Sequence, residues 1–209
     1  MPASRRCLLL ISLPVLAVAV AAACVPETVY PGDLTIGTFD FQAQANWALT
    51  DCKRDGGDFN RLVDGGFAFS GTFSRDSLDG GVWFTIDGFS RKAVFDAPTQ
   101  RYVTTHRAGA QIPSCGEGCK GAEIEESMSV VVLSDSQDRA IGSRCANLTD
   151  GGLPDGSVPG PTLNGYDAER ACGELKVVFL PGKSVECKCV TSCTAVYGVE
   201  GKRHFNGGK

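Results

Sequence analysis

The chain has 209 residues, of which 43% are hydrophobic and 21% charged, and it contains 26 glycines and 10 prolines. This is the composition of a turn-rich soluble protein, so collagen, a coiled coil and a wholly disordered chain are excluded. The formal net charge of -4 at pH 7 argues against a nucleic-acid partner, and ten cysteines beside two histidines indicate an exported protein with disulfide bonds.

The first 23 residues have the order of features that defines an export signal. Arg5 and Arg6 stand before an apolar run from Leu8 to Ala23, which ends in small residues. The run is shorter than the ~20 apolar residues that a membrane-spanning helix needs, and no basic stop-transfer segment follows it. We therefore predict that residues 1–23 are a signal peptide that is removed on export.

The residues at the expected cleavage site are Ala21, Ala22, Ala23 and Cys24. This tetrapeptide resembles the lipobox of bacterial lipoprotein precursors, and the resemblance implies that the Cys24 thiol is acylated and becomes the first residue of the mature protein. Ala21 and Ala23 also fit the A-x-A site of ordinary signal peptidase, which would release a secreted protein without an anchor. Lipidation leaves eight further cysteines, which can pair completely, whereas secretion leaves nine, so the count favours lipidation.

The lipoprotein resemblance implies that the membrane is a partner, bound through the lipid on Cys24. Val25 stands where many lipoproteins retained in the inner membrane have Asp, so the outer membrane is the expected location. The periplasm and the cell surface are the alternatives. Pro26 and Pro31 predict that residues 24–33 form a short extended tether after the lipid, and residues 34–209 have the length of one domain.

From residue 39 onward the hydrophobic pattern has a period of two, which is typical of strands with one buried face. Phe39 to Leu49 alternates apolar and polar side chains. Phe67, Phe69 and Phe73 form a second series, in which Gly71 indicates a bulge or a close approach of neighbouring groups. No window beyond the leader has a convincing helical apolar stripe. The expected strands cover residues 39–50, 67–73, 82–86, 93–95, 102–106, 122–133, 175–180 and 185–197.

The turn residues support the same fold class. Asp-Gly pairs, in which glycine supplies the positive φ of a hairpin turn, begin at Asp55, Asp64, Asp79, Asp87, Asp150 and Asp155. Many short strands in one domain predict an all-β fold, either an antiparallel sandwich or a barrel. Asn147 to Tyr166 is expected to be a long surface loop rich in glycine and proline. Gly-Thr-Phe occurs at residues 37–39 and 71–73 and hints at a duplicated unit.

The cysteines of the mature chain are expected to form disulfide bonds that staple the fold. Zinc is the alternative for the C-terminal group, but its spacings of one and three residues differ from the usual two, so we expect no metal and no cofactor. Cys145 and Cys172 would close the base of the long loop, while a hairpin turning at Gly182 and Lys183 would place Cys172 opposite Cys193. The candidates are Cys52, Cys115, Cys119, Cys145, Cys172, Cys187, Cys189 and Cys193, and their connectivity stays open.

The sequence lacks some of the residues that a calcium-binding loop or a catalytic triad requires. Asp51 to Gly56 is the segment nearest to a calcium loop, but Lys53 stands at the place of the second acidic ligand, so we interpret the segment as a turn. The histidines are His106 and His204, and no Gly-x-Ser-x-Gly motif accompanies them. We expect His106 to be a surface or hydrogen-bonded sheet residue, and His204 to lie in a solvated basic tail of residues 202–209.

Paired carboxylates provide the sharpest enzymatic hypothesis. Glu123 and Glu125 share one face of an expected strand about 7 Å apart, roughly the separation of glycosidase carboxyl groups. Glu123-Ile124-Glu125 resembles the Glu-Ile-Asp-x-x-Glu strand of laminarinase-type β-sandwich glycosidases, and the resemblance implies that Glu123 is the nucleophile. The position of the second catalytic Glu is not acidic in this chain. A solvated acidic strand face is the alternative, and we interpret Trp47 and Trp83 as sheet packing.

These observations predict a lipid-anchored, non-catalytic β-domain of the bacterial envelope with an interaction or structural role. Its protein or glycan partner is not identified by the sequence. The first alternative is a secreted or envelope glycan hydrolase that uses the paired glutamates. The second alternative is a ligand-binding β-barrel, which would have an apolar cavity where a sandwich has a filled core.

Overall fold

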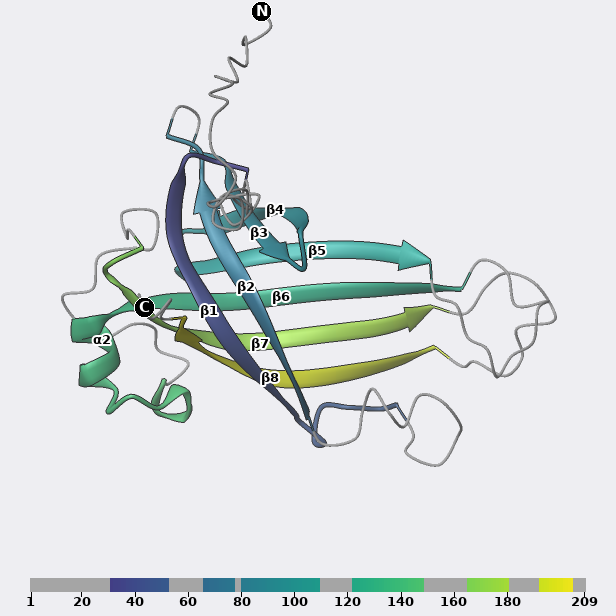
Figure 1. Ribbon diagram of the computed structural model, residues 1–209. Helices are drawn as coiled ribbons and strands as arrows, with labels where there is room; N and C mark the ends of the chain where they lie inside the picture. Colours follow the sequence, from purple (N-terminus) through teal and green to yellow (C-terminus); the bar gives the residue numbers. More distant parts are fainter. Residues whose placement is uncertain are drawn as a thin grey trace, which may run out of the picture.

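The computed structural model describes residues 31–52, 66–77, 80–109, 122–148, 165–180 and 192–204. These residues form eight antiparallel strands, each paired with the next along the chain, and β8 pairs with β1 to close a barrel (Figure 1). Of the two predicted β architectures, the fold is therefore the barrel. The strands are β1 (Leu34–Ala45), β2 (Gly66–Arg75), β3 (Val82–Ile86), β4 (Phe89–Asp96), β5 (Arg101–Gly109), β6 (Glu123–Ser134), β7 (Ala168–Leu180) and β8 (Cys193–Arg203).

Strand β1 shows how the alternating sequence produces two different faces. Phe39 and Phe41 are fully buried inside the barrel, whereas Asp40 and Gln42 are exposed on its outside. Successive side chains of a strand point to opposite faces, so the period of two in the sequence becomes an apolar interior and a polar exterior. The prediction of strands from this period is confirmed.

The first strand ends earlier than expected, at Ala45, because a turn begins at Asn46. The Asn46 carbonyl accepts a hydrogen bond from the Leu49 backbone N–H at 3.1 Å, and its side-chain oxygen accepts one from the Ala48 N–H at 3.2 Å. Asparagine favours such turns because its side chain can bond to nearby backbone groups. Trp47 therefore lies in the turn and is 45% exposed, so the interpretation of this residue as sheet packing is wrong.

The two Gly-Thr-Phe triplets lie opposite each other on β1 and β2. Thr38 pairs with Thr72, their hydroxyl oxygens lie 2.9 Å apart, and each glycine stands opposite the phenylalanine of the other triplet. Gly71 permits a close approach, since a Cβ atom there would lie 2.6 Å from the ring of Phe84. The resemblance between the triplets thus coincides with the pairing of two adjacent strands.

Aromatic side chains fill one end of the barrel. Phe39, Phe41, Phe73, Phe84 and Tyr102 are fully buried. The ring centroid of Phe73 lies 4.3 Å from that of Phe84 and 5.4 Å from that of Tyr102, distances at which aromatic rings attract each other. Burial raises the pKa of Tyr102, whose hydroxyl has no hydrogen-bond partner among the described residues.

The first part of the connection between β6 and β7, residues 135–148, packs on the outside of the barrel. It contains the helix α2 (Asp135–Ala140) and the 3-10 helix η2 (Cys145–Asn147), and Figure 1 shows α2 beside the end of β6. Ile141, which follows α2, joins Val131 and Leu133 of β6 in a small buried cluster separate from the barrel interior. This cluster holds the connection against the outer face of the sheet.

A capping box starts α2. The Ser134 hydroxyl accepts a hydrogen bond from the Gln137 backbone N–H, and the Gln137 side-chain oxygen accepts one from the Ser134 N–H at 2.7 Å. The sequence Ser-x-x-Gln is the signal that indicates this helix start. Apolar periodicity does not reveal the helix, because six residues are too few to show a stripe.

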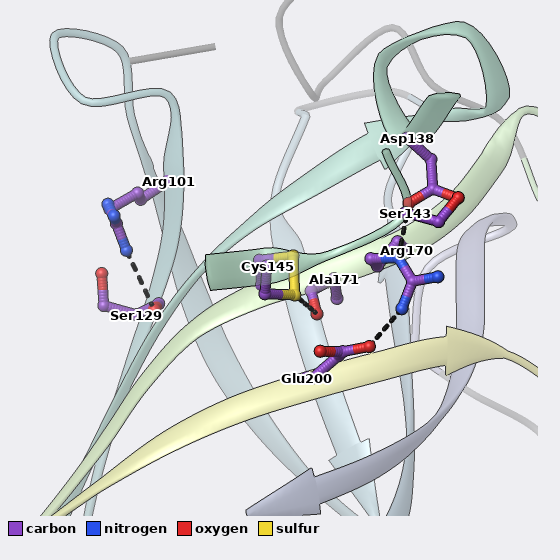
Figure 2. The surroundings of a disulfide bond; sticks show 9 residues. Arg101, Ser129, Asp138, Ser143, Cys145, Arg170, Ala171 and Glu200 are labelled. Carbon is purple, nitrogen blue, oxygen red and sulfur yellow. Dashed lines mark hydrogen bonds and ion pairs between the residues drawn. A yellow bond between two sulfur atoms is a disulfide. The ribbon is translucent and has the colours of Figure 1, made fainter. Parts of the chain in front are cut away.

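Two disulfide bonds join described residues. Cys145 is bonded to Cys172 of β7, so the base of the long loop is closed as expected (Figure 2). Cys52 is bonded to Cys193 at the start of β8. The alternative pairing of Cys172 with Cys193 is wrong, because Cys172 packs in the outer cluster whereas Cys193 packs against the barrel core. The predictions for residues 1–23 and 149–164 and for Cys24, Cys115, Cys119, Cys187 and Cys189 concern residues outside the described ranges.

Candidate functional site

The barrel contains a cavity that borders the aromatic core and lies toward the end where β2 begins. Its volume is about 330 Å³, and strands β2 to β8 all contribute to its wall. Most of the lining residues are apolar. Every second residue of a strand faces the interior, and in these strands the inward positions are mainly apolar. The lining residues are Phe67, Phe69, Phe84, Ile86, Asp87, Arg91, Thr104, Ile124, Glu126, Met128, Leu175, Val177, Phe179 and Tyr197.

Aromatic rings form one side of the cavity. Phe69 stacks on Phe41 of the core with ring centroids 4.9 Å apart, and Phe67 meets Tyr197 edge-on at 5.3 Å. Phe67 is 39% exposed and marks the rim of the cavity. Burial raises the pKa of Tyr197, which keeps this phenol neutral at ordinary pH. The aromatic side of the site is therefore uncharged.

An ion pair crosses the opposite side of the cavity. Arg91 of β4 reaches past β5, and its Nη1 atom lies 2.7 Å from Oε2 of Glu126 on β6. The side chains of Arg91 and Glu126 are 21% and 35% exposed, so the pair is partly shielded from water. Nε of Arg91 is buried and has no hydrogen-bond partner among the described residues. Thr104, between them on β5, donates its hydroxyl to the Lys92 carbonyl at 3.2 Å.

Sequence reasoning did not single out Arg91 or Glu126, although a signal for each is present. Glu126 lies between Ile124 and Met128 in an inward series, and Arg91 precedes the buried Ala93 by two positions on β4. A charged residue at an inward position of an alternating strand indicates a functional or ion-paired group. Which residue completes the pair depends on the packing of the barrel, since Arg91 and Glu126 are not on adjacent strands.

The predicted catalytic glutamates lie elsewhere. Glu123 and Glu125 share one face of β6, as expected, but it is the outer face, because Ile124 and Glu126 line the cavity. Arg107 of β5 contacts both, with Nη2 2.7 Å from Glu125 Oε2 and Nη1 3.5 Å from Glu123 Oε2. Hydrogen bonding to Glu125 and the charges of both glutamates raise the Arg107 pKa. Since neither glutamate lines the cavity, the geometry does not support the paired-glutamate hydrolase hypothesis.

The two histidines have different surroundings. His106 is exposed on β5 and pairs in register with Glu126, which agrees with a surface or sheet residue. His204 is held against β1, with Nδ1 2.7 Å from Asp40 Oδ2 and its backbone N–H 2.8 Å from the Thr38 carbonyl. A hydrogen bond from Ser70 and, second, one from His204 lower the Asp40 pKa. Lys202 and His204 are exposed, as expected for a solvated segment, but they do not form a free tail, because β8 runs to Arg203 and His204 contacts β1. Residues 205–209 lie outside the described part.

One group of potential metal ligands lies close together among the described residues, formed by Asp51, Cys52 and Cys193. The two sulfur atoms are bonded to each other, so they are not thiolate ligands. Asp51 accepts a hydrogen bond from the Thr194 backbone N–H. Cys193 thus belongs to a disulfide rather than to a zinc site, and most of the segment considered for calcium, residues 53–56, is outside the described chain.

Comparison with protein-family models, with curated protein sequences and with solved structures finds no match to this chain. Across the described ranges, no helix is long and apolar enough to cross a membrane.

Proposed function

We propose that the protein is an exported, lipid-anchored binding protein of the bacterial envelope whose barrel holds one small, mainly apolar ligand without converting it. The cavity is the observation that carries this proposal. Its volume of about 330 Å³ lies at the lower end of the range for small-molecule sites, about 300–1,000 Å³. An apolar wall with a few polar groups is the usual composition of such sites. An unfilled apolar cavity also destabilises a fold, and a bound ligand removes that cost.

The position of the chain entry is compatible with an anchor at Cys24. The Pro31 carbonyl accepts a hydrogen bond from Ser74, and Asp33 Oδ1 accepts one from the Ser77 backbone N–H at 2.7 Å. These contacts lie where β2 ends, whereas the cavity rim at Phe67 lies where β2 begins. Residues 31–33 thus contact the barrel at the end opposite the cavity, and a lipid on Cys24 would leave the cavity accessible if the preceding residues continue away from that end.

Ligand binding is tested with N-phenyl-1-naphthylamine, an uncharged aromatic dye whose emission rises in apolar surroundings. We expect saturable binding of one dye per chain. Val177→Trp should weaken binding at least about tenfold, equivalent to ~1.4 kcal/mol, because the larger side chain occupies the cavity. The matched control is Val178→Trp, the neighbouring valine whose side chain faces the outside of β7, and it should bind like the wild type.

Two outcomes would contradict the binding proposal. The first is an emission that rises linearly with dye concentration and never saturates. The second is equal binding by Val177→Trp and Val178→Trp, provided that circular dichroism shows both variants to be folded. Either result would place the dye outside the barrel.

Intact mass spectrometry of the protein from its native envelope tests the anchor. We expect a chain that begins at Cys24 and carries a diacyl or triacyl adduct, and eight cysteines that react with an alkylating agent only after reduction. A Cys24→Ser variant is the control and should lack the adduct. An unacylated chain beginning at Cys24 or beyond would overturn the anchor while leaving ligand binding open to its own test.

A further inference from the structure

We infer that the cavity selects an uncharged ligand that combines an apolar body with a carbonyl oxygen. This inference rests on the proposed binding function and names the class of ligand. The recognition element is the guanidinium of Arg91, held by Glu126 on the wall of an otherwise mainly apolar cavity.

The Arg91 guanidinium has an N–H donor that lacks an acceptor. Its Nη1 atom is 2.7 Å from Glu126 Oε2, but Nε is buried without a hydrogen-bond partner in the described part of the chain. Nε and Nη2 form one edge of the planar group and present two roughly parallel N–H donors. A buried donor that lacks an acceptor is unfavourable, so a ligand oxygen at this edge would gain a charge-assisted hydrogen bond after a small shift of the side chain.

The charges of the lining residues favour an uncharged acceptor oxygen over a carboxylate. Glu126 already neutralises Arg91, and Asp87, at the turn after β3, lines the same cavity. The described residues that line the cavity thus carry a formal excess of one negative charge, which a carboxylate ligand would meet while losing its hydration. A ketone, ester or amide oxygen accepts the same hydrogen bond without bringing a charge.

The test compares three ligands of similar shape, 2-acetylnaphthalene, 2-isopropylnaphthalene and 2-naphthoate, as competitors of N-phenyl-1-naphthylamine at pH 7.5. Burial of apolar surface alone would favour the isopropyl compound. We expect the ketone to compete at a concentration about tenfold or more lower than the isopropyl compound, because only the ketone accepts from Arg91. Naphthoate should be weaker than the ketone.

Substitutions then assign the preference to the ion pair. The double variant Arg91→Met with Glu126→Gln removes both charges together, so no carboxylate is left unpaired, and it should bind the isopropyl compound at least as well as the ketone. Arg91→Lys, which keeps the charge but loses the donor edge, should reduce the ketone preference. The matched control is Arg107→Met with Glu125→Gln, a similar ion pair on the outer face, which should retain the wild-type order.

Several results would overturn the inference. Equal competition by the ketone and the isopropyl compound in the wild type, tighter binding of naphthoate, or an unchanged order in the Arg91 variants would each do so, while saturable dye binding would leave the proposed function standing. Absence of saturable dye binding in the wild type would instead overturn the proposed function, and this inference with it.

Discussion

Replacing Phe73 with alanine should lower the free energy of unfolding by about 3–5 kcal/mol, the range for removing a phenylalanine from a packed core. Phe73 is fully buried, and its ring contacts Phe84, Tyr102 and Phe39 at centroid distances of 4.3, 5.4 and 6.4 Å. Alanine would leave a hole among these rings. Urea denaturation followed by near-ultraviolet circular dichroism measures the loss.

Phe89→Ala is the matched control for this prediction. Phe89 begins β4 and is 75% exposed, so the same substitution there should change the free energy of unfolding by less than about 0.5 kcal/mol. Similar losses at both positions would mean that the interior of the barrel is not packed as the ring contacts indicate.

Replacing Arg170 with methionine should destabilise the fold by about 3–5 kcal/mol, because it leaves a buried carboxylate without its counter-ion. Arg170 of β7 binds Asp138 of α2 through Nε and Glu200 of β8 through Nη1 (Figure 2). The Arg170 and Asp138 side chains are each only 8% exposed. The guanidinium therefore joins the outer helix to two strands, and methionine has a similar length but no charge. Urea denaturation of the wild type and of Arg170→Met at pH 7 measures the difference in the free energy of unfolding.

Arg139→Met provides the comparison for the buried pair. Arg139 pairs with Asp135 within α2, and its side chain is 71% exposed. Exposed pairs of this spacing contribute about 0.3–0.5 kcal/mol, so its removal should have little effect. A loss at Arg170 as small as that at Arg139 would show that Asp138 is hydrated in the folded protein, contrary to its burial.

The carboxylates of β6 show how far sequence reasoning reaches. Alternation correctly predicts that Glu123 and Glu125 share one face and that Glu126 lies on the other. Alternation alone does not decide which face becomes the interior, because β6 has apolar residues on both faces, such as Val130 in the barrel core and Val131 in the outer cluster. The structure places Glu126 in the cavity and leaves the other two on the outside with Arg107.

The sequence by itself determined most of the described strands, the turn at Asp87 and the use of four described cysteines in disulfide bonds, because these follow from local alternation, local backbone preferences and residue type. The tertiary structure decided that the sheet closes into a barrel, through pairs such as Phe41 with Gly201. It also decided which end remains hollow and that Arg91 meets Glu126 across β5. These features depend on the register and curvature of strands far apart in the chain, which a local pattern does not contain.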